Sequence, residues 1–485
     1  MWLLRLALSL LGATGLAAHA TTAPTTTPCR LPGVPHEAQC GSLSRALAPA
    51  HEHGTQIELH FAVLPALARH AAPDPVFFIA GGPGQSAIDL AGPVGRMLAR
   101  LGRTRDIVLV DQRGSGRSAP LHCDDAPKTP PLREQFDAPL QLEQLRRCLA
   151  RLQALPYGDL RFFGTSVAMA DLDAVRQALG ARRINLVAAS YGTRAALEYL
   201  RQYPQQVRRV VLDGVVPPDM ALADAAAVDA QAAFGALLRD CAADVRCRQR
   251  HPQLRQRWLA LLASLPREVR VADPLSGRSE SLRLTVDALQ RLVRTALYAP
   301  STASALPAAI EAAAQGRFEP LVALAAALSG ATARAGLAQG MHFAVVCSED
   351  RPRDGGPPEP SATLGAGLAA WYREVCAFWP RGEPPAGFGQ LGATRAPVLL
   401  LSGGIDPATP PRHGARVARA LGANARHEVV PQAGHGVLAL PCIAEAVNHF
   451  IDAADDAEAL RVDTGCARGM PRPLPFVPPG STPAP

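Results

Sequence analysis

Three side chains suited to acyl transfer lie in separate loops of this sequence. Ser190 stands in "VAASYGTRA", between an apolar run and a helix-forming run. Asp406 follows the apolar run of "LLLSGGIDPATPP", and His435 lies between glycines in "VVPQAGHGVL". A serine becomes a nucleophile when a histidine accepts its proton and a carboxylate orients that histidine. We therefore predict that Ser190, Asp406 and His435 form a catalytic triad.

The surroundings of Ser190 predict a strand, a sharp turn and a helix. The apolar run 184–190 is typical of a buried parallel strand, and the segment after it has helical spacing up to Pro204. A turn of this kind strains the serine backbone and needs small flanking residues. Gly192 meets that need, whereas Ala188 stands where a first glycine is usual.

Each triad member also has an ordinary interpretation. Ser190 could simply end a strand, Asp406 could form a turn before its proline, and His435 could lie on the surface. Two independent loops, each after a predicted strand, carry the required residue, so we favour catalysis. The other histidines, His51 and His53 among them, lack partners at metal-ligand spacing, and we expect no metal and no cofactor.

An oxyanion hole needs backbone N–H groups aimed at the developing negative charge. One donor should be Tyr191, directly after the serine. The second should come from the glycine-rich loop 78–87, "FFIAGGPGQSA". Pro83 has no N–H group, so Gly82 is our first choice and Gly81 our second. The alternative is an ordinary glycine turn.

A second glycine-rich segment, 110–119, invites a different interpretation. It matches G-x-G-x-x-A after a strand, a pattern found in dinucleotide-binding proteins. Pro120 follows at once, so no helix begins where a pyrophosphate would need one. We exclude nucleotide binding here and expect Arg113 and Arg117 to brace this loop.

The first twenty residues predict an export signal. Arg5 precedes an apolar stretch, and Ala-His-Ala at 18–20 is a cleavage signal that would leave Thr21 as the first mature residue. The stretch is too short for a stable membrane anchor. We therefore expect a protein of the periplasm or the extracellular medium.

The ten cysteines fit an oxidising compartment, since all follow the signal and none forms C-x-x-C. Pairing of near neighbours predicts five disulfides: Cys29–Cys40, Cys123–Cys148, Cys241–Cys247, Cys347–Cys376 and Cys442–Cys466.

The charge distribution argues against nucleic-acid binding. The net charge is +7, but the arginines are scattered among 42 acidic residues, aromatic residues make up only 5%, and Lys128 is the only lysine. Nothing in the sequence indicates an oligomeric state.

Strands and helices alternate along much of the chain, which predicts an α/β fold with a doubly wound, mostly parallel sheet. One amphipathic helix is predicted at 166–180. The predicted strands are 57–64, 75–80, 106–111, 184–190, 209–214, 397–403 and 427–431. The alanine- and leucine-rich region from about 218 to 340 contains little that resembles a buried strand, and it predicts a helical cap inserted between strands of the sheet. Proline-rich stretches at 126–139, at 351–360 and from 471 onward predict loops or disorder.

These motifs together resemble a known family. "GGPGQS", "DQRGSGRS", "ASYGTRAALEYLRQYP", "VVLDGVVPP", "GGIDPATPP" and "AGHGVL" are similar to the secreted α/β-hydrolase peptidases of the prolyl and tripeptidyl aminopeptidase type. The resemblance runs from Cys29 to Cys466 and implies a helical cap inserted between strands. It also implies a serine exopeptidase acting on peptides with free N-termini. Ala80, where prolyl aminopeptidases usually have histidine, favours the tripeptidyl branch, in which the position of Ala188 also varies.

The expected division of the chain is a signal peptide (1–20), a first part of the hydrolase core (21–217), a helical cap (218–340), a second core part similar to the C-terminal region of tripeptidyl aminopeptidases (341–470) and a disordered tail (471–485).

An exopeptidase must recognise a protonated amino terminus, which calls for a shielded carboxylate. Glu349 and Asp350, in "VVCSEDRP", are our candidates, since the resemblance places this segment and "VCAFWP" near the active site. The alternative is a solvated acidic pair, or a pair bound to Arg351 and Arg353. A secreted esterase or other small-molecule hydrolase remains the competing function, because one triad serves esters and amides alike.

Overall fold

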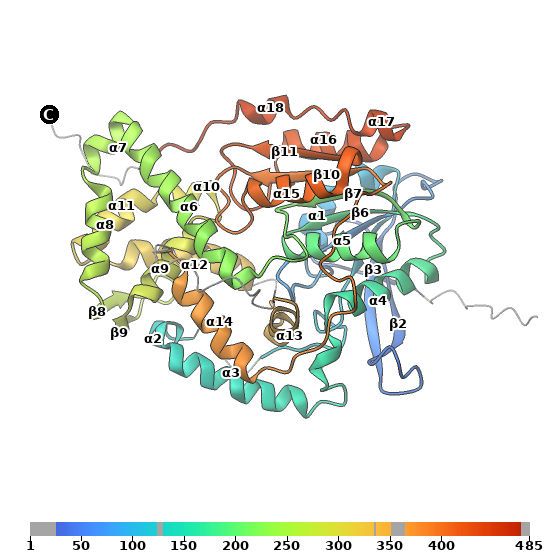
Figure 1. The fold of residues 1–485 in the computed structure, drawn as a ribbon, viewed down its shortest axis with the longest axis horizontal. Coiled ribbons are helices and arrows are strands. Elements are labelled where there is room, and N and C mark those ends of the chain that lie inside the picture. The colour runs from blue at the N-terminus through green and yellow to red at the C-terminus, as the bar shows by residue number, and fades with distance from the viewer. Residues whose placement is uncertain (1–25, 124–129, 334–335, 351–363, 477–485) are drawn as a thin grey trace, which may run out of the picture.

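The computed structural model describes residues 26–123, 130–333, 336–350 and 364–476. The predicted signal peptide and the proline-rich stretch 351–360 lie outside these residues. Figure 1 shows a sheet-centred unit beside a mainly helical region, with the C-terminal segment running across both.

A nine-stranded sheet forms the centre of the first unit, in the order β1-β2-β3-β5-β4-β6-β7-β10-β11. The six strands from β5 to β11 in this order run parallel, and β1, β2 and β3 add an antiparallel edge. The predicted mostly parallel sheet is therefore confirmed. The strands are β1 (Thr27–Cys29), β2 (Ala38–Ala46), β3 (Gln56–Leu64), β4 (Val76–Ile79), β5 (Ile107–Val110), β6 (Ile184–Ala189), β7 (Val207–Asp213), β10 (Val398–Gly403) and β11 (Ala425–Val430).

The sequence did not predict β1 and β2. The sequence of β2, "AQCGSLSRA", contains few large apolar residues, and most of its positions remain partly exposed. Its place at the sheet comes from antiparallel pairing with β3 rather than from burial on both faces.

Helices cover both faces of the sheet, as its alternating side chains require. Phe78 and Val187 point to a cluster with α1 (Ala91–Met97) and α16 (Pro441–Asp452). Phe77 and Leu186 point to the opposite cluster. That cluster includes α4 (Thr165–Ala178), α5 (Tyr191–Gln202) and α15 (Pro411–Leu421).

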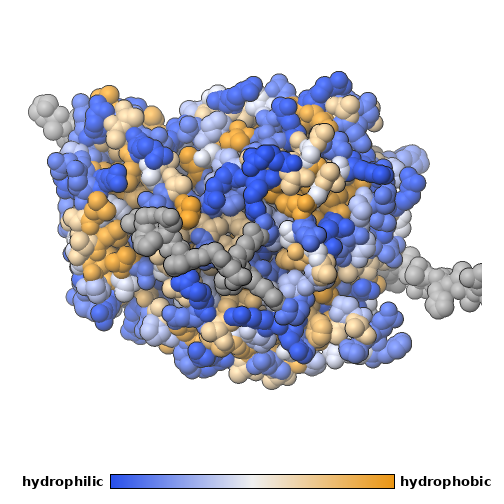
Figure 2. All heavy atoms as spheres, in the orientation of Figure 1, coloured by the Kyte–Doolittle hydropathy of each residue, from blue (hydrophilic) through white to orange (hydrophobic). Residues whose placement is uncertain are grey.

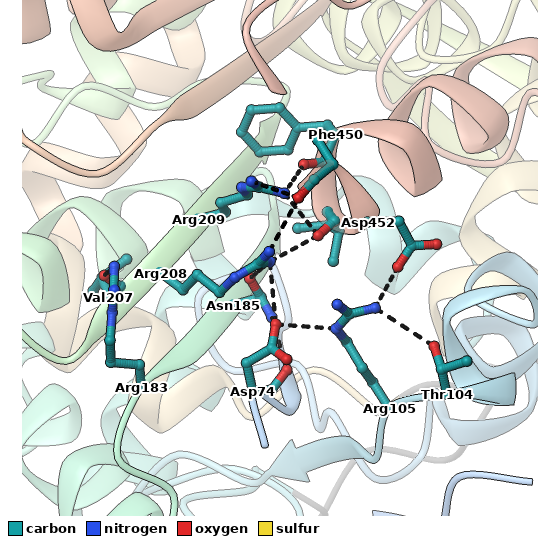
Figure 3. A network of polar contacts seen from close by, with 12 residues as sticks. Asp74, Thr104, Arg105, Arg183, Asn185, Val207, Arg208, Arg209, Phe450 and Asp452 are labelled. Carbon is teal, nitrogen blue, oxygen red and sulfur yellow. Dashed lines mark hydrogen bonds and ion pairs between the residues drawn. The ribbon is translucent and has the colours of Figure 1, made fainter. Parts of the chain in front are cut away.

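A buried polar network fixes α16 to the amino-terminal end of the sheet (Figure 3). Arg105 Nε donates to Asp74 Oδ2 at 3.0 Å, and its Nη1 forms an ion pair with Asp452 at the end of α16. Arg209 Nη1 donates to the Phe450 carbonyl at 2.6 Å. Arginine side chains thus satisfy carbonyls that the last helical turn leaves unpaired.

The region between β7 and β10 has a hydrophobic core of its own, which includes Phe234, Trp258 and Leu289. Its helices are α6 (Leu222–Ala243), α7 (Val245–Arg250), α8 (Leu254–Ala263), α9 (Val286–Ala296), α10 (Pro300–Ala303), α11 (Leu306–Ala314), α12 (Glu319–Ala333), α13 (Gln339–Glu349) and α14 (Ala366–Phe378). The sequence indicated little buried strand here and did not predict the antiparallel hairpin that β8 (Arg267–Ala272) and β9 (Ser279–Leu284) form. Both strands alternate exposed and less exposed residues, which distinguishes them from the fully buried strands that we sought.

Residues 126–129 of the proline-rich stretch 126–139 lie outside the described residues, and the rest of the stretch is not wholly a loop. It contains α2 (Leu132–Phe136) and the start of α3 (Ala138–Gln153). Asp137 caps α3 by accepting a hydrogen bond from the Leu140 N–H at 2.9 Å, and a proline in the first turn leaves no helical bond unmade. The start of the predicted tail, 471–476, has no regular structure, and 477–485 lie outside the described residues.

The ten cysteines form the same five pairs that the sequence predicts. Cys347–Cys376 joins α13 to α14. Within the described ranges, no helix has the length and apolar character needed to traverse a bilayer. On the face drawn in Figure 2, hydrophobic residues are interspersed among hydrophilic ones.

Candidate active site

Ser190 occupies a strained turn between β6 and α5. Its backbone has φ 54° and ψ −126°, a conformation that side-chain-bearing residues rarely adopt. Three hydrogen bonds hold it there. The Ser190 N–H donates to the Asp213 carbonyl at 2.8 Å, and the Thr193 N–H and Oγ1 donate to the Ser190 carbonyl at 2.8 and 2.6 Å. This geometry is that of a nucleophile elbow.

The two small residues that flank Ser190 differ in the space around them. A Cβ on Gly192 would lie 2.3 Å from the Ile79 carbonyl oxygen, so no other residue fits without moving β4. Ala188 is fully buried within β6, where it pairs with Ile79 and Leu212 in the neighbouring strands. The second position of the motif is therefore sterically restricted to glycine, while the first accommodates a methyl group.

Asp406 and His435 are hydrogen-bonded. Asp406 Oδ2 lies 2.8 Å from His435 Nδ1, and the carboxylate also accepts the Thr409 Oγ1 hydroxyl at 2.7 Å. The N–H groups of Ala408 and Thr409 donate to the other carboxylate oxygen, at 2.7 and 2.9 Å. Thr409 Oγ1 is also 3.1 Å from His435 Nδ1, a contact that the sequence motif did not reveal.

The pair is electrostatically suited to general-base chemistry. Burial opposes ionisation of Asp406, but the charge and hydrogen bond of His435 lower its pKa to about 2. Burial also opposes protonation of His435, yet the Asp406 carboxylate raises the pKa of the imidazole above its ordinary 6.5. An ionised Asp406 thus orients the ring and stabilises the imidazolium that forms when a proton arrives.

Asp213, at the end of β7, connects the serine to the histidine loop. Its carboxylate accepts from the N–H of Val437 at 2.8 Å and from the N–H of Leu438 at 2.9 Å, just after His435. Gly214 lies against the imidazole, since a Cβ there would be 3.3 Å from His435 Cε1. The motif "VVLDG" contained this aspartate, but nothing in the sequence indicated its partners.

The predicted oxyanion loop lies beside Ser190. A Cβ on Gly81 would be only 3.1 Å from Ser190 Cβ, and Gly82 adopts φ 112°, which favours glycine. The Tyr191 N–H belongs to the first turn of α5, where helices leave N–H groups without an intrahelical partner. Gly84 and Ala338 join this loop to the start of α13 through a hydrogen bond of 2.9 Å.

Glu349 and Asp350, the candidate amine anchors, lie at the C-terminal end of α13 and are buried. Their side chains are only 2% and 3% exposed, so the alternative of a solvated pair is wrong. Glu349 accepts from the Thr165 N–H at 2.7 Å and from Thr165 Oγ1 at 2.9 Å. Arg194 Nη1 donates to Asp350 Oδ1 at 2.7 Å and lies 3.6 Å from Glu349. Arg351 and Arg353, the partners considered from the sequence, lie outside the described residues.

This cluster is adjacent to α5, the helix that begins directly after Ser190. Arg194 follows Ser190 by one helical turn, and Thr165 Oγ1 is 2.7 Å from the hydroxyl of Tyr191. Burial raises the pKa of Glu349 to about 7 and also raises the pKa of Asp350, although Arg194 opposes both shifts. Two carboxylates thus share one guanidinium within a shielded environment.

Comparison with known proteins identifies the fold family. The family model described as "alpha/beta hydrolase fold" matches residues 74–440. This chain belongs to the α/β hydrolase family. It is 26% identical to the tripeptidyl aminopeptidase of Streptomyces coelicolor, over 91% of this chain and 85% of that protein. It is 28% identical to the serine protease Hip1 of Mycobacterium tuberculosis, over 70% of this chain and 71% of that protein. It is 27% identical to the carboxylesterase B of Mycobacterium tuberculosis, over 87% of this chain and 86% of that protein.

The predicted α/β-hydrolase fold is therefore confirmed, and so is the resemblance to the tripeptidyl aminopeptidase type. The relatives carry names from two classes of hydrolase, peptidase and esterase, so the family alone does not decide the substrate.

The structure of this α/β hydrolase also describes the arginines and histidines for which we expected no catalytic role. Arg113 is buried and donates to Asp171 of α4 at 2.6 and 3.0 Å, so it braces its loop. The Arg117 backbone N–H donates to Asp111 at 3.3 Å. His51 and His53 are exposed.

Proposed function

We propose that this α/β hydrolase is an exported serine aminopeptidase that releases residues or short peptides from free peptide N-termini. One observation carries the proposal beyond the fold family. The buried carboxylates Glu349 and Asp350 share a single arginine, Arg194, one helical turn from Ser190. When both are ionised, the cluster has one negative charge more than it has positive charges.

The reaction begins with attack of Ser190 Oγ on the scissile carbonyl carbon, while His435 accepts the serine proton. The resulting oxyanion receives hydrogen bonds from the N–H groups of Tyr191 and Gly82, with Gly81 as the alternative donor. His435 then donates its proton to the leaving amine, and an acyl-enzyme remains on Ser190. Water attacks that ester with His435 again as the base, which regenerates the serine.

The excess negative charge provides the reason for amine recognition. An unbalanced buried carboxylate is costly, and the raised pKa of Glu349 reflects that cost. A substrate ammonium group would supply the missing positive charge and a strong hydrogen bond. The chain length from this ammonium to the carbonyl at Ser190 would then set how many residues are released.

Two further observations support the proposal. The relatives named tripeptidyl aminopeptidase cover most of this chain, at 26% identity. Five disulfides among the described residues agree with an oxidising compartment, as an exported protein would meet. The second candidate is an esterase, which the similarity to carboxylesterase B favours.

A substrate comparison tests this proposal. Peptides with a free amino terminus, the same peptides with an acetylated amino terminus, and a small neutral ester are assayed side by side. We expect cleavage of the free peptides and little cleavage of the acetylated ones. Good cleavage of acetylated peptides would reject the exopeptidase, and turnover of the ester alone would support the esterase.

The Glu349→Gln variant tests the amine anchor. It should weaken catalysis on free-amine peptides by roughly 2–4 kcal/mol of transition-state binding, with little effect on the ester. Glu198→Gln is a matched control. Glu198 is also a buried glutamate and lies on α5, like Arg194, but it pairs with Arg201. Equal losses on peptide and ester in Glu349→Gln would reject the anchor role, and thermal melting separates that outcome from misfolding.

A further inference from the structure

A charged cavity lies between α3 and two helices of the region that connects β7 to β10. It has a volume of about 230 Å³ and is bordered by α3, α9 and α14. These three helices lie near one another in Figure 1, to the side of the sheet. The lining contains two arginines, Arg291 and Arg294, and one acidic residue, Asp287.

The cavity is rich in hydrogen-bond donors that have no acceptor. Among the described residues, Arg294 Nε and Trp371 Nε1 are buried without a hydrogen-bond partner. Arg291 Nη1 donates only weakly to Gln141 Oε1, at 3.4 Å. Burial lowers the pKa of Arg291, although Asp287 offsets part of that effect. Unsatisfied buried donors are costly, and an anionic acceptor would remove the cost.

One wall of the cavity leads to the catalytic histidine. Arg294 Nη2 donates to the hydroxyl of Tyr298 at 3.0 Å. The carbonyl of Tyr298 accepts the His435 N–H at 2.8 Å, and the Tyr298 ring packs edge-on against the imidazole at 5.1 Å. Arg294 is therefore separated from the general base by a single side chain.

The other wall leads to the oxyanion loop. Trp371 and Tyr372 are neighbours on α14, and the Tyr372 hydroxyl lies 2.8 Å from His342 Nε2. His342 Nδ1 lies 3.3 Å from the Pro83 carbonyl, within the loop that holds Gly82. The cavity is thus linked through side chains both to the loop of His435 and to the glycine-rich loop beside Ser190.

We propose that Arg291, Arg294 and the Trp371 indole N–H form a subsite that binds a carboxylate of the substrate peptide. The inference rests on the proposed aminopeptidase function and specifies its substrate class. The cavity has one positive charge in excess, whereas the cluster of Glu349, Asp350 and Arg194 has one negative charge in excess. A peptide with a free ammonium group and a carboxylate matches both sites. The carboxylate is either an acidic side chain or the free carboxyl terminus of a short peptide.

Calorimetry on the Ser190→Ala protein tests the subsite without turnover. The first probe series consists of alanine tetrapeptide amides in which each position in turn carries glutamate or, for comparison, glutamine. The second series compares tetra-alanine with a free carboxyl terminus and tetra-alanine with an amidated one. We expect at least one carboxylate peptide to bind about tenfold more tightly than its neutral partner. A preference in the first series identifies a side-chain carboxylate, and one in the second series identifies the carboxyl terminus.

The same titrations are repeated after Arg291→Gln and Arg294→Gln. Each change should reduce the preference to within about twofold, while Arg283→Gln, at an exposed position of β9, should leave the preference intact. The inference is overturned if no pair differs, or if Arg291→Gln retains the full preference in a protein with unchanged thermal melting. Absence of binding by every peptide would overturn it together with the proposed function.

Amino-terminal acetylation separates the two proposals. If acetylated peptides bind as well as free ones but still show an Arg291-dependent preference, the carboxylate subsite stands and the aminopeptidase fails. If only free-amine peptides bind and none shows a carboxylate preference, the aminopeptidase stands and the subsite fails.

Discussion

Asp213 accepts the backbone N–H of Ser190 on its carbonyl, at 2.8 Å, while its carboxylate accepts two N–H groups from the loop that follows His435. One residue at the end of β7 thus fixes the proposed nucleophile relative to its base. Burial raises the pKa of Asp213 to about 6, against the opposing effect of the Leu438 and Val437 N–H groups. Its role is positional, because it bonds to the backbone of both loops.

Replacement of this carboxylate should disturb the histidine loop. In Asp213→Asn, the negative charge that attracts the Val437 and Leu438 N–H groups is lost, and the NH₂ group takes the place of Oδ1, 3.0 Å from the Val437 nitrogen, so the anchoring weakens by about 1–3 kcal/mol. We expect kcat to fall by at least tenfold with a smaller change in KM. Asp106→Asn is the control, since Asp106 also accepts a backbone N–H, from Ala66 at 2.8 Å, at the other end of the sheet. Equal kinetic effects in both variants would contradict the positional role.

Loss of the nucleophile should abolish turnover and leave the fold intact. Ser190→Ala removes one oxygen from the turn, and the rate should fall by roughly 10³-fold or more, because only binding and the oxyanion donors remain. A fluorophosphonate should label one equivalent of the wild-type protein at Ser190 and fail to label His435→Ala. Normal activity of Ser190→Ala would refute the proposed mechanism.

The two flanking positions of the elbow should respond in opposite ways. Gly192→Ala places a Cβ 2.3 Å from the Ile79 carbonyl oxygen, so we expect loss of activity and of soluble folded protein. Ala188→Gly should retain activity and lose about 1 kcal/mol of stability through chain entropy. Steady-state kinetics and thermal melting measure both effects. An active Gly192→Ala protein, or an inactive Ala188→Gly protein, would disagree with the packing.

The pH dependence should differ between peptides and esters. The pKa of Glu349 is raised to about 7, so the carboxylate that would bind an ammonium group is lost as the pH falls through 7. For a free-amine peptide, kcat/KM should therefore fall below pH 7 and again above roughly pH 8, where the peptide amine deprotonates. The ester should show only the acidic limb of His435, whose protonation removes the general base.

In Glu349→Gln, the fall of kcat/KM at low pH should become the same for the peptide as for the ester, because only the protonation of His435 then remains. Identical profiles for peptide and ester in the wild-type protein would argue against ammonium binding at Glu349.

The sequence by itself determined the fold family and the strands of the parallel sheet, and near-neighbour pairing predicted the five disulfides that the structure then established. Ser190, Asp406 and His435 could be selected because each follows an apolar strand, and parallel strands bring their carboxyl ends to one edge of the sheet. Near-neighbour cysteine pairing was a good rule here, because the partners have sequence separations of only 6 to 29.

Only the tertiary structure decided which side chains surround these residues. The contacts of Asp213 and Arg194, and the contact of Thr409 with His435, join separate loops and helices, and no local pattern encodes them. The carboxylates Glu349 and Asp350 were recognisable from their motif, but their burial depends on packing of α13 against α4 and α5. The cavity of Arg291 and Arg294 lies between helices far apart in sequence, so residue spacing carries no trace of it.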